Sequence, residues 1–138
     1  MPTSFSGGCA CGAIRYECAA EPLYMGNCHC RDCQRATGSA YFAAVGVSLS
    51  AFRLTTGTPA VYEKPADSGN TMRRMFCSQC GSPVFLTNSA RPDLVVLYAA
   101  SVEDPSWVQP ARDIYTASAQ PWDHMNPALP KFPKMPQG

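Results

Sequence analysis

Seven of the eight cysteines in this 138-residue chain fall into three short clusters, and their spacing constrains the fold more than any other feature. The clusters are Cys9-x-Cys11, Cys28-His29-Cys30-x-x-Cys33 and Cys77-x-x-Cys80. A tetrahedral zinc site needs thiolates about 2.3 Å from the ion, and therefore about 3.8 Å apart, and two cysteines in one tight turn supply half of such a site. We therefore interpret the clusters as parts of metal sites.

The number of cysteines in each group indicates whether its metal site is closed or open. The first and third clusters together supply four thiolates, which complete a tetrahedron, whereas the second cluster supplies three and leaves one position vacant. A closed zinc site is structural, and an open one can bind water or a substrate. The sequence therefore predicts one structural zinc and one zinc that is able to do chemistry.

A disulfide framework is the alternative interpretation of eight cysteines. No positively charged start with a following apolar run precedes Cys9, so we expect no secretory signal and a reducing, cytoplasmic location. The chain is also long enough for a hydrophobic core of its own, and its cysteine content lies below that of disulfide scaffolds. Metal binding is therefore favoured over disulfide bonding.

Length and charge indicate one domain that acts on a small molecule. A net charge of +1, with 15% charged residues, gives no basic field for nucleic-acid binding, and no apolar stretch is long enough for a membrane span. The composition shifts after Trp107, and four prolines after residue 126 predict an extended tail. We expect a single domain over residues 1–126, a tail over residues 127–138, and no nucleic-acid or membrane partner. The sequence leaves the oligomeric state open.

The pattern of hydrophobic residues is typical of a β protein. Thirteen prolines and ten glycines break the chain into short runs, and no window keeps helical periodicity for three turns. Ile14, Tyr16 and Cys18 alternate with Arg15 and Glu17, which predicts a strand with one buried face. Further predicted strands span residues 40–47, 60–63, 71–76, 84–87 and 94–100. The last is the most apolar and is expected to be central, and residues 31–37 predict a single helical turn.

These motifs, in this order, resemble the glutathione-dependent formaldehyde-activating enzyme family, whose domain is shared with centromere protein V. The resemblance runs from about Gly7 to Trp122 and is carried by the three cysteine clusters with their flanking residues, Gly7-Gly8 and Gly12-x-x-Arg15-Tyr16 around the first and Phe76 and Gly81 around the third. It implies a mainly β, β-tent-like fold of two small antiparallel sheets joined by zinc-binding cysteine clusters. It also implies a structural zinc on Cys9, Cys11, Cys77 and Cys80 and a catalytic zinc on Cys28, Cys30 and Cys33.

The open site predicts chemistry on a thiol. Glutathione or a similar thiol could take the fourth position on zinc, where a thiol is deprotonated and becomes a nucleophile. Its attack on formaldehyde or another small aldehyde would form a carbon–sulfur bond. The reverse reaction cleaves that bond, which is why the resemblance implies a carbon–sulfur lyase.

Other polar residues have simpler interpretations. His29 is expected to point away from the metal and to form a hydrogen bond that stabilises its turn. Asp32 is interpreted as a turn or capping residue, His124 as exposed, and Cys18 as a small buried hydrophobic residue. Four arginines could bind the carboxylates of glutathione, although a solvated surface is favoured for them: Arg31, Arg35, Arg73 and Arg74. Five aromatic residues are expected in the core rather than at a substrate site: Tyr41, Phe42, Phe76, Phe85 and Tyr98.

Other classes of function remain open. In a non-catalytic binding module, zinc would only hold the sheets together, and the second site would have a fourth protein ligand. A thiol oxidoreductase of the methionine sulfoxide reductase B type also combines dithiol zinc clusters with a β-rich fold, and Cys18 would have to be its catalytic cysteine. A nucleic-acid-binding zinc ribbon ranks last because the near-neutral charge gives little attraction for phosphate.

Overall fold

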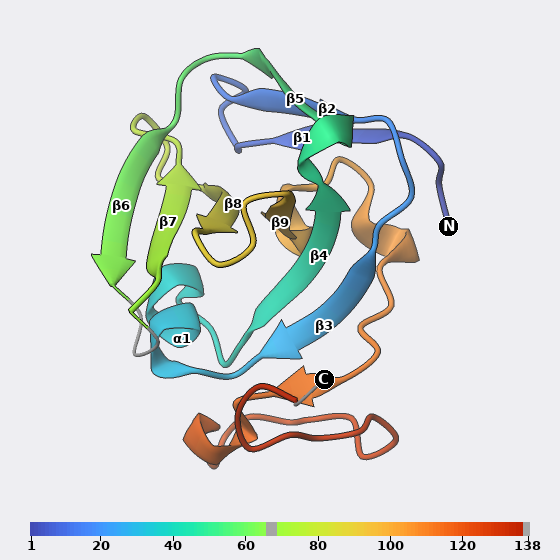
Figure 1. Ribbon diagram of the computed structural model, residues 1–138, viewed down its shortest axis with the longest axis vertical. Helices are drawn as coiled ribbons and strands as arrows, with labels where there is room; N and C mark the ends of the chain where they lie inside the picture. The colour runs from blue at the N-terminus through green and yellow to red at the C-terminus, as the bar shows by residue number, and fades with distance from the viewer. Residues whose placement is uncertain (66–68, 137–138) are drawn as a thin grey trace.

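Two sheets make up most of the molecule (Figure 1). The computed structural model describes residues 1–65 and 69–136. The small sheet has the order β1-β2-β5, with β1 at Phe5–Gly8, β2 at Arg15–Cys18 and β5 at Phe52–Thr56. The large sheet has the order β10-β3-β4-β9-β8-β7-β6. Its strands are β3 (Tyr24–Cys28), β4 (Phe42–Ser48), β6 (Ala60–Pro65), β7 (Thr71–Phe76), β8 (Pro83–Asn88), β9 (Leu94–Tyr98) and β10 (Asp113–Ile114).

The expected mainly β fold with two sheets is confirmed, and the pairing adds detail. The two sheets are unequal, with three strands in one and seven in the other. All strand pairs are antiparallel except β10 with β3, which are parallel. The parallel pair brings a segment from the end of the chain to the strand that carries Cys28.

Helical structure is short. The helix α1 spans Arg31–Thr37, and single 3-10 turns span Leu49–Ala51, Ala99–Ser101, Pro105–Trp107 and Thr116–Ser118. The N-cap of the helix is Cys30, whose sulfur accepts a hydrogen bond from the Cys33 amide, and its C-cap is Gly38, with a left-handed φ of 68°. Among residues 1–65 and 69–136, no helix combines the length and the apolar character needed to cross a membrane.

The main hydrophobic core lies between the two sheets. Ile14, Tyr16 and Cys18 of the small-sheet side are buried there, as their alternation with Arg15 and Glu17 predicts. The large sheet supplies Val45, Val47, Val95 and Leu97 among others. The packing places the first cysteine loop, between β1 and β2, close to the large sheet.

The other face of the large sheet is also apolar. Side chains alternate across a strand, so Phe42 and Ala44 of β4 and Leu94 and Val96 of β9 point away from the main core and form a second cluster with Cys33 of α1. With both faces covered, β9 is buried along its whole length, as its apolar sequence predicts. This second cluster, rather than the main core, is next to the second group of cysteines.

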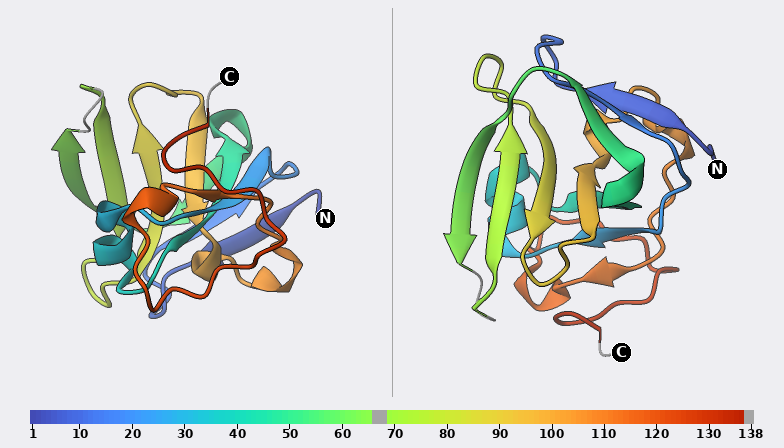
Figure 2. Two further views of the ribbon diagram at one scale, coloured as in Figure 1. Left: turned by 90° about the horizontal axis from the view of Figure 1, so that it is seen from below. Right: turned by 45° about the horizontal axis from the view of Figure 1, so that its top comes forward.

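The end of the chain lies against β3, below the sheets in Figure 1 and towards the viewer in the left view of Figure 2. Asp113 of β10 accepts a backbone hydrogen bond from Phe132 at 2.9 Å and donates one to Pro130 at 3.0 Å. The proline-rich residues therefore run beside β10. The domain boundary at residue 126 stays a prediction.

Candidate metal centres

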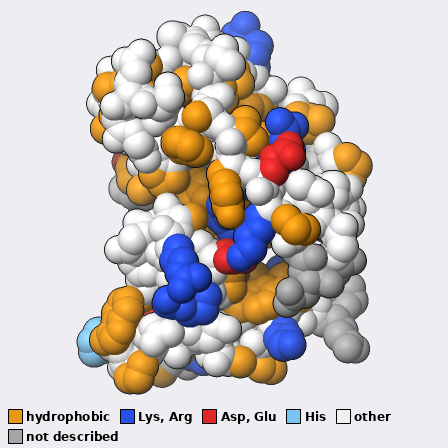
Figure 3. Space-filling view, turned by 90° about the vertical axis from the view of Figure 1, so that its left-hand side faces the viewer, with side chains coloured by type: hydrophobic (Ala, Val, Ile, Leu, Met, Phe, Trp, Pro, Cys, Tyr) orange, Lys and Arg blue, Asp and Glu red, His pale blue; other side chains and the backbone are white. Residues whose placement is uncertain are grey.

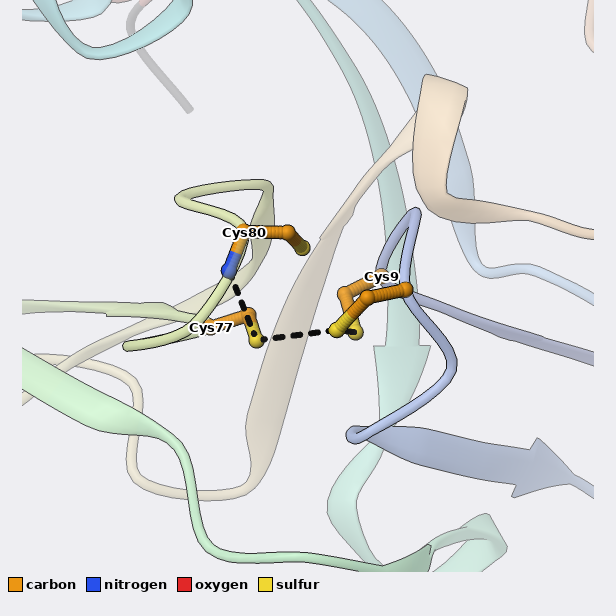
Figure 4. Close-up of side chains that lie close together, drawn as sticks. Cys9, Cys77 and Cys80 are labelled. Carbon is orange, nitrogen blue, oxygen red and sulfur yellow. Dashed lines mark hydrogen bonds between the residues drawn. The ribbon is translucent and has the colours of Figure 1, made fainter.

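Four cysteines from two distant loops meet between the sheets. We call Cys9, Cys11, Cys77 and Cys80 the four-thiol cluster: their sulfurs all lie within 4.8 Å of one another. The Cys11 sulfur lies 3.7 Å from that of Cys9 and 3.7 Å from that of Cys77, close to the separation of about 3.8 Å expected on a tetrahedral zinc. Figure 4 shows Cys9 on one loop facing Cys77 and Cys80 on the other. The geometry of this cluster fits a closed metal site.

The two loops of the four-thiol cluster turn their backbone amides towards sulfur. The Ile14 amide donates to Cys9 Sγ at 3.2 Å, and the Gln79 amide donates to Cys77 Sγ at 3.4 Å. Gly12 and Gly81, which follow the cysteine pairs, have φ values of 82° and 77°, in the left-handed region that favours glycine. These amides stabilise thiolate charge and therefore a bound cation.

The second group of cysteines, which we call the three-thiol cluster, is formed by consecutive elements. Cys28 ends β3, Cys30 precedes α1, and Cys33 lies in its first turn. The three sulfurs lie within 4.8 Å of one another, so they could hold a metal ion. Cys33 is buried, while Cys28 and Cys30 are partly exposed, so the cluster is open to solvent on one side. Among the residues that the structure describes, no fourth His, Cys, Asp or Glu places a ligand atom within 4.8 Å of all three sulfurs.

The thiols of the three-thiol cluster shift one another's pKa values. Hydrogen bonds from the Cys28 and Cys33 thiols lower the pKa of the Cys30 thiol, with further stabilisation from the Cys33 amide and the charge of Arg74. Hydrogen bonds with Cys30, and then with Cys33, raise the pKa of the Cys28 thiol. The three thiols are therefore electrostatically coupled, and a negative charge in the cluster is stabilised by the Cys33 amide and Arg74.

Arg74 of β7 is the nearest cationic side chain with a direct contact to this cluster. Its Nη2 donates to Cys33 Sγ at 3.7 Å, and its Nη1 donates to Tyr98 Oη at 2.9 Å. Arg73, the preceding residue, points to the other face of β7 and pairs with Glu63 at 3.0 Å on the surface. Arg74 thus contacts the three-thiol cluster instead of lying on the solvated surface that the sequence predicts for it.

His29 holds the turn of the three-thiol cluster from behind. Its Nε2 pairs with Asp113 Oδ1 at 2.8 Å, and its Nδ1 pairs with Asp123 Oδ2, with all three side chains 1% exposed. Lys131 pairs with the second oxygen of Asp113 at 3.2 Å. Gln34 of α1 adds to the network, because its amide donates to the His29 carbonyl at 2.8 Å. The imidazole therefore faces the carboxylates of the C-terminal segment rather than the thiols, in line with the expected hydrogen-bonding role.

A cavity of about 570 Å³ opens beside the three-thiol cluster. Its floor is the outer apolar face of the large sheet and includes Phe42, Ala44, Met72, Leu86, Leu94 and Val96. Four basic side chains also line it: Lys64, Arg74, Arg91 and Arg112. On the face in Figure 3, Lys and Arg side chains lie beside hydrophobic ones around a recess. Phe42 was expected only in the core, and the structure shows that it lines this cavity as well.

Tyr115 is a further cavity residue that the sequence did not single out. Its φ of 56° and ψ of 37° are left-handed, a conformation that is costly for a bulky residue and that occurs often near ligand sites. The Tyr115 amide donates to the Lys134 carbonyl at 3.3 Å, a contact between residues distant in sequence that no local sequence signal identifies.

The remaining singled-out residues have structural surroundings. Asp32 pairs with Lys64 at 2.6 Å, and the N-cap position of α1 belongs to Cys30 instead. His124 is exposed. Cys18 is 1% exposed in the main core, where its thiol donates to the Ala20 carbonyl at 3.6 Å. Such burial is unfavourable for the exposed catalytic cysteine that an oxidoreductase would need.

Comparisons with known proteins agree with the motifs. Residues 4–118 match the family described as glutathione-dependent formaldehyde-activating enzyme. A curated relative from Halomonas elongata, named "Putative glutathione-dependent formaldehyde-activating enzyme", is 26% identical over 102 residues, which cover 70% of this chain and 64% of the relative. The chain thus matches less than two thirds of that relative's length. A solved structure of a Rhodobacter sphaeroides protein has a TM-score of 0.60 at 20% identity, covering 92% of this chain and 98% of that one, and shows the same fold.

Proposed function

The chain belongs to the glutathione-dependent formaldehyde-activating enzyme family, and on this premise we propose that it forms or cleaves adducts between a small thiol and an aldehyde. The observation that carries this proposal is the convergence of Cys28, Cys30 and Cys33 beside a cavity large enough for a ligand. Three protein thiolates leave one position of a tetrahedral ion for a substrate. The proposed class of enzyme is a carbon–sulfur lyase.

We propose zinc as the metal at both clusters, one ion per cluster. The all-sulfur donor sets, and the sulfur separations of 3.7 Å in the four-thiol cluster, support this choice. A zinc ion held by the three-thiol cluster would lower the pKa of a thiol in its fourth position and so supply a thiolate nucleophile near neutral pH.

The side chains around the cluster bind and orient that thiol. Cys28, Cys30 and Cys33 fix the direction from which its sulfur approaches, and His29 fixes the turn that carries them. Arg74 contributes a positive charge 3.7 Å from Cys33 Sγ, which offsets the excess negative charge of three thiolates. In the reaction, the thiolate forms a bond to the carbonyl carbon, the carbonyl electron pair moves to oxygen, and that oxygen takes up a proton. The reverse steps break the carbon–sulfur bond and release thiol and aldehyde.

The charges around the cavity support an anionic thiol such as glutathione. Lys64, Arg74, Arg91 and Arg112 outnumber Asp32, the acidic side chain in its lining. Glutathione carries two carboxylates, which arginine and lysine side chains bind well. The side chains of Lys64 and Arg91 are 46% and 62% exposed and form surface ion pairs with Asp32 and Asp93, which a ligand carboxylate at the entrance of the cavity would compete with.

Titration with thiols tests the proposal. Protein with cobalt in place of zinc reports its ligands by visible absorption, and glutathione should change the spectrum of the three-thiol site as a fourth sulfur binds. Cys30→Ser should abolish this change and the catalysed exchange between glutathione and formaldehyde. A spectrum of four sulfurs at both sites before any thiol is added, or a glutathione response that survives Cys30→Ser, would contradict the proposal.

A further inference from the structure

The floor of the cavity has more apolar surface than chemistry on formaldehyde requires. Formaldehyde adds only one carbon and one oxygen to a thiol, so its adduct places no extended apolar group in the cavity of about 570 Å³. Its floor is formed by side chains that alternate outward from β4 and β9, among them Phe42, Ala44, Leu94 and Val96.

The floor is also poorly suited to the peptide part of glutathione. The strands beneath it pair with each other, Ala44 with Tyr98, Gly46 with Val96, and Leu86 with Val96, so their peptide groups are engaged within the sheet. An amide or carboxylate placed on this floor would lose hydration without gaining hydrogen bonds from those peptide groups. The polar ligand groups fit better at the exposed basic side chains of the entrance, Lys64 and Arg91.

One arrangement satisfies both parts of the cavity. In this arrangement the ligand sulfur lies at the three-thiol cluster and the carboxylates lie at the entrance. The carbon from the aldehyde, which is bonded to the sulfur, and its substituent then lie on the floor of the cavity. Cys28, Cys30 and Met72 pack against the apolar side chains of the floor, which include Phe42 and Val96. The floor is therefore continuous with the three-thiol cluster.

We propose that the aldehyde-derived part of the substrate is a bulky apolar group, so that the preferred substrates are thiol adducts of alkyl or aryl aldehydes rather than of formaldehyde. This inference rests on the proposed function for the position of the sulfur. The apolar group packs against Leu94, Val96 and Leu86 and is removed from water there.

Unreactive thioethers test the apolar group without any turnover. The zinc-loaded full chain is titrated calorimetrically with S-methyl-, S-butyl- and S-hexylglutathione. Each methylene buried on the floor should tighten binding by up to about fourfold, so S-hexylglutathione should bind at least about tenfold more tightly than S-methylglutathione. Equal affinities, tighter binding of S-methylglutathione, or no binding of any of the three would overturn the inference.

A matched pair of substitutions on β9 locates the effect. Val96→Thr keeps the shape of the side chain and places a hydroxyl on the floor, and it should weaken S-hexylglutathione at least about fivefold relative to S-methylglutathione. Val95→Thr makes the same change in the main core, on the other face of the strand, and should leave the dependence on chain length intact. Equal changes in that dependence in both variants would contradict an apolar floor as its cause.

The two proposals fail in different ways. Rates of thiol exchange with formaldehyde, butanal and hexanal should give a kcat/KM that rises along the series. If formaldehyde has the highest kcat/KM, the apolar-substrate inference is wrong while the lyase remains. If no aldehyde reacts but thioether affinity still rises with chain length, the lyase is wrong while the apolar binding site stands.

Discussion

Arg74 places a guanidinium 3.7 Å from Cys33 Sγ and is held there by Tyr98, to whose hydroxyl oxygen it donates at 2.9 Å. Residues that contact metal ligands in this way typically change metal affinity 10- to 100-fold, in order of magnitude, when replaced. We therefore expect Arg74→Gln to weaken zinc binding at the three-thiol cluster by roughly 10- to 100-fold. Competition with a chromophoric chelator measures this zinc affinity, because the chelator removes the more weakly bound of the two ions first.

Arg73→Gln is the control for Arg74→Gln because it removes the adjacent guanidinium, which pairs with Glu63 on the surface. Its effect on zinc affinity should be within the error of the measurement, and the four-thiol cluster should be unaffected in both variants. Equal weakening in the two variants would show that the general positive charge of β7, and not the contact with Cys33, is responsible.

Tyr16 gives a residue-level prediction of pH dependence. Burial raises its pKa from 10.0 to about 12, against the opposing hydrogen bond with Ser101. The folded state therefore keeps the phenol proton at a pH where the unfolded chain loses it. This contribution to the free energy of unfolding is fully present below pH 10 and is lost as pH rises through 12, in total about 2 to 3 kcal/mol.

Urea unfolding of the protein and of Tyr16→Phe, at pH 9 and near pH 12, checks the effect of Tyr16. The variant should be less stable at pH 9 by about 1 kcal/mol, because the buried hydrogen bond between Tyr16 Oη and Ser101 Oγ is lost. It should then lose less stability than the unmodified protein as pH rises. Identical alkaline losses would assign the pH dependence to other groups.

Among the strands and helices, the sequence predicted best those elements that a local hydrophobic pattern specifies. The boundaries of the predicted strand 71–76 and of the helical turn 31–37 agree with β7 and α1. Four strands were not predicted: β1, β3, β5 and β10. Glycine interrupts the short runs of β1 and β3, β5 is largely exposed, and β10 has only two residues. Their strand conformation depends on pairing with neighbouring strands, β1 and β5 with β2, β3 with β4, and β10 with β3, and these pairings are tertiary contacts.

The cysteine groups were predictable for a similar reason. Each dithiol pair lies in one turn, so its spacing is a local signal, and the order of the clusters matches a known family. The partners of His29 were not predictable, since Asp113 and Asp123 lie 84 and 94 residues further along the chain. The cavity depends on the outward face of a sheet whose strand order is not local either.

The C-terminal segment and the three-thiol turn are predicted to open together. Asp123→Asn keeps the size of the side chain but removes the charge that pairs with the buried His29. Breaking a buried pair by removing one partner costs about 3 to 5 kcal/mol. Hydrogen exchange should therefore accelerate at the His29 amide, which donates to Ile114, and at the Asp113 amide, which donates to Pro130.

The surface variant Glu17→Gln is the comparison for Asp123→Asn. Glu17 pairs with Arg53 across β2 and β5, and both side chains are well exposed, so its loss should change stability by less than about 1 kcal/mol. Slower thiol exchange in Asp123→Asn, with zinc content maintained, would identify His29 as a positioning residue. Unchanged amide exchange at His29 and Asp113 would mean that the two carboxylates do not hold the turn.

At the scale of the whole molecule, the two cysteine clusters join different parts of the fold. The four-thiol cluster joins the β1–β2 loop of the small sheet to the β7–β8 loop of the large sheet, and Cys11 and Cys77 are 66 residues apart in sequence. The three-thiol cluster joins only β3 to the adjacent helix. Closing a long loop costs a few kcal/mol of chain entropy, and apparent zinc affinities of about 10 to 16 kcal/mol exceed this cost. A metal at the four-thiol cluster thus stabilises the contact between the sheets. A metal at the three-thiol cluster constrains only a turn between elements that are adjacent in sequence.

The same substitution at the two clusters should separate these effects. Cys80→Ser removes a thiolate from the four-thiol cluster, and we expect a loss of at least about 3 kcal/mol, which lowers Tm by roughly 10 °C or more in a domain of this size. Cys30→Ser should lower Tm by a few degrees only, because β3 and α1 keep their backbone contacts. Calorimetry of the zinc-loaded variants measures both, with metal content determined on the same samples. Prolonged treatment of the unmodified protein with a strong chelator should reproduce the Cys80→Ser result as the four-thiol site empties. A larger fall in Tm for Cys30→Ser than for Cys80→Ser would contradict this interpretation. It would mean that the three-thiol cluster, and not the four-thiol cluster, stabilises the fold.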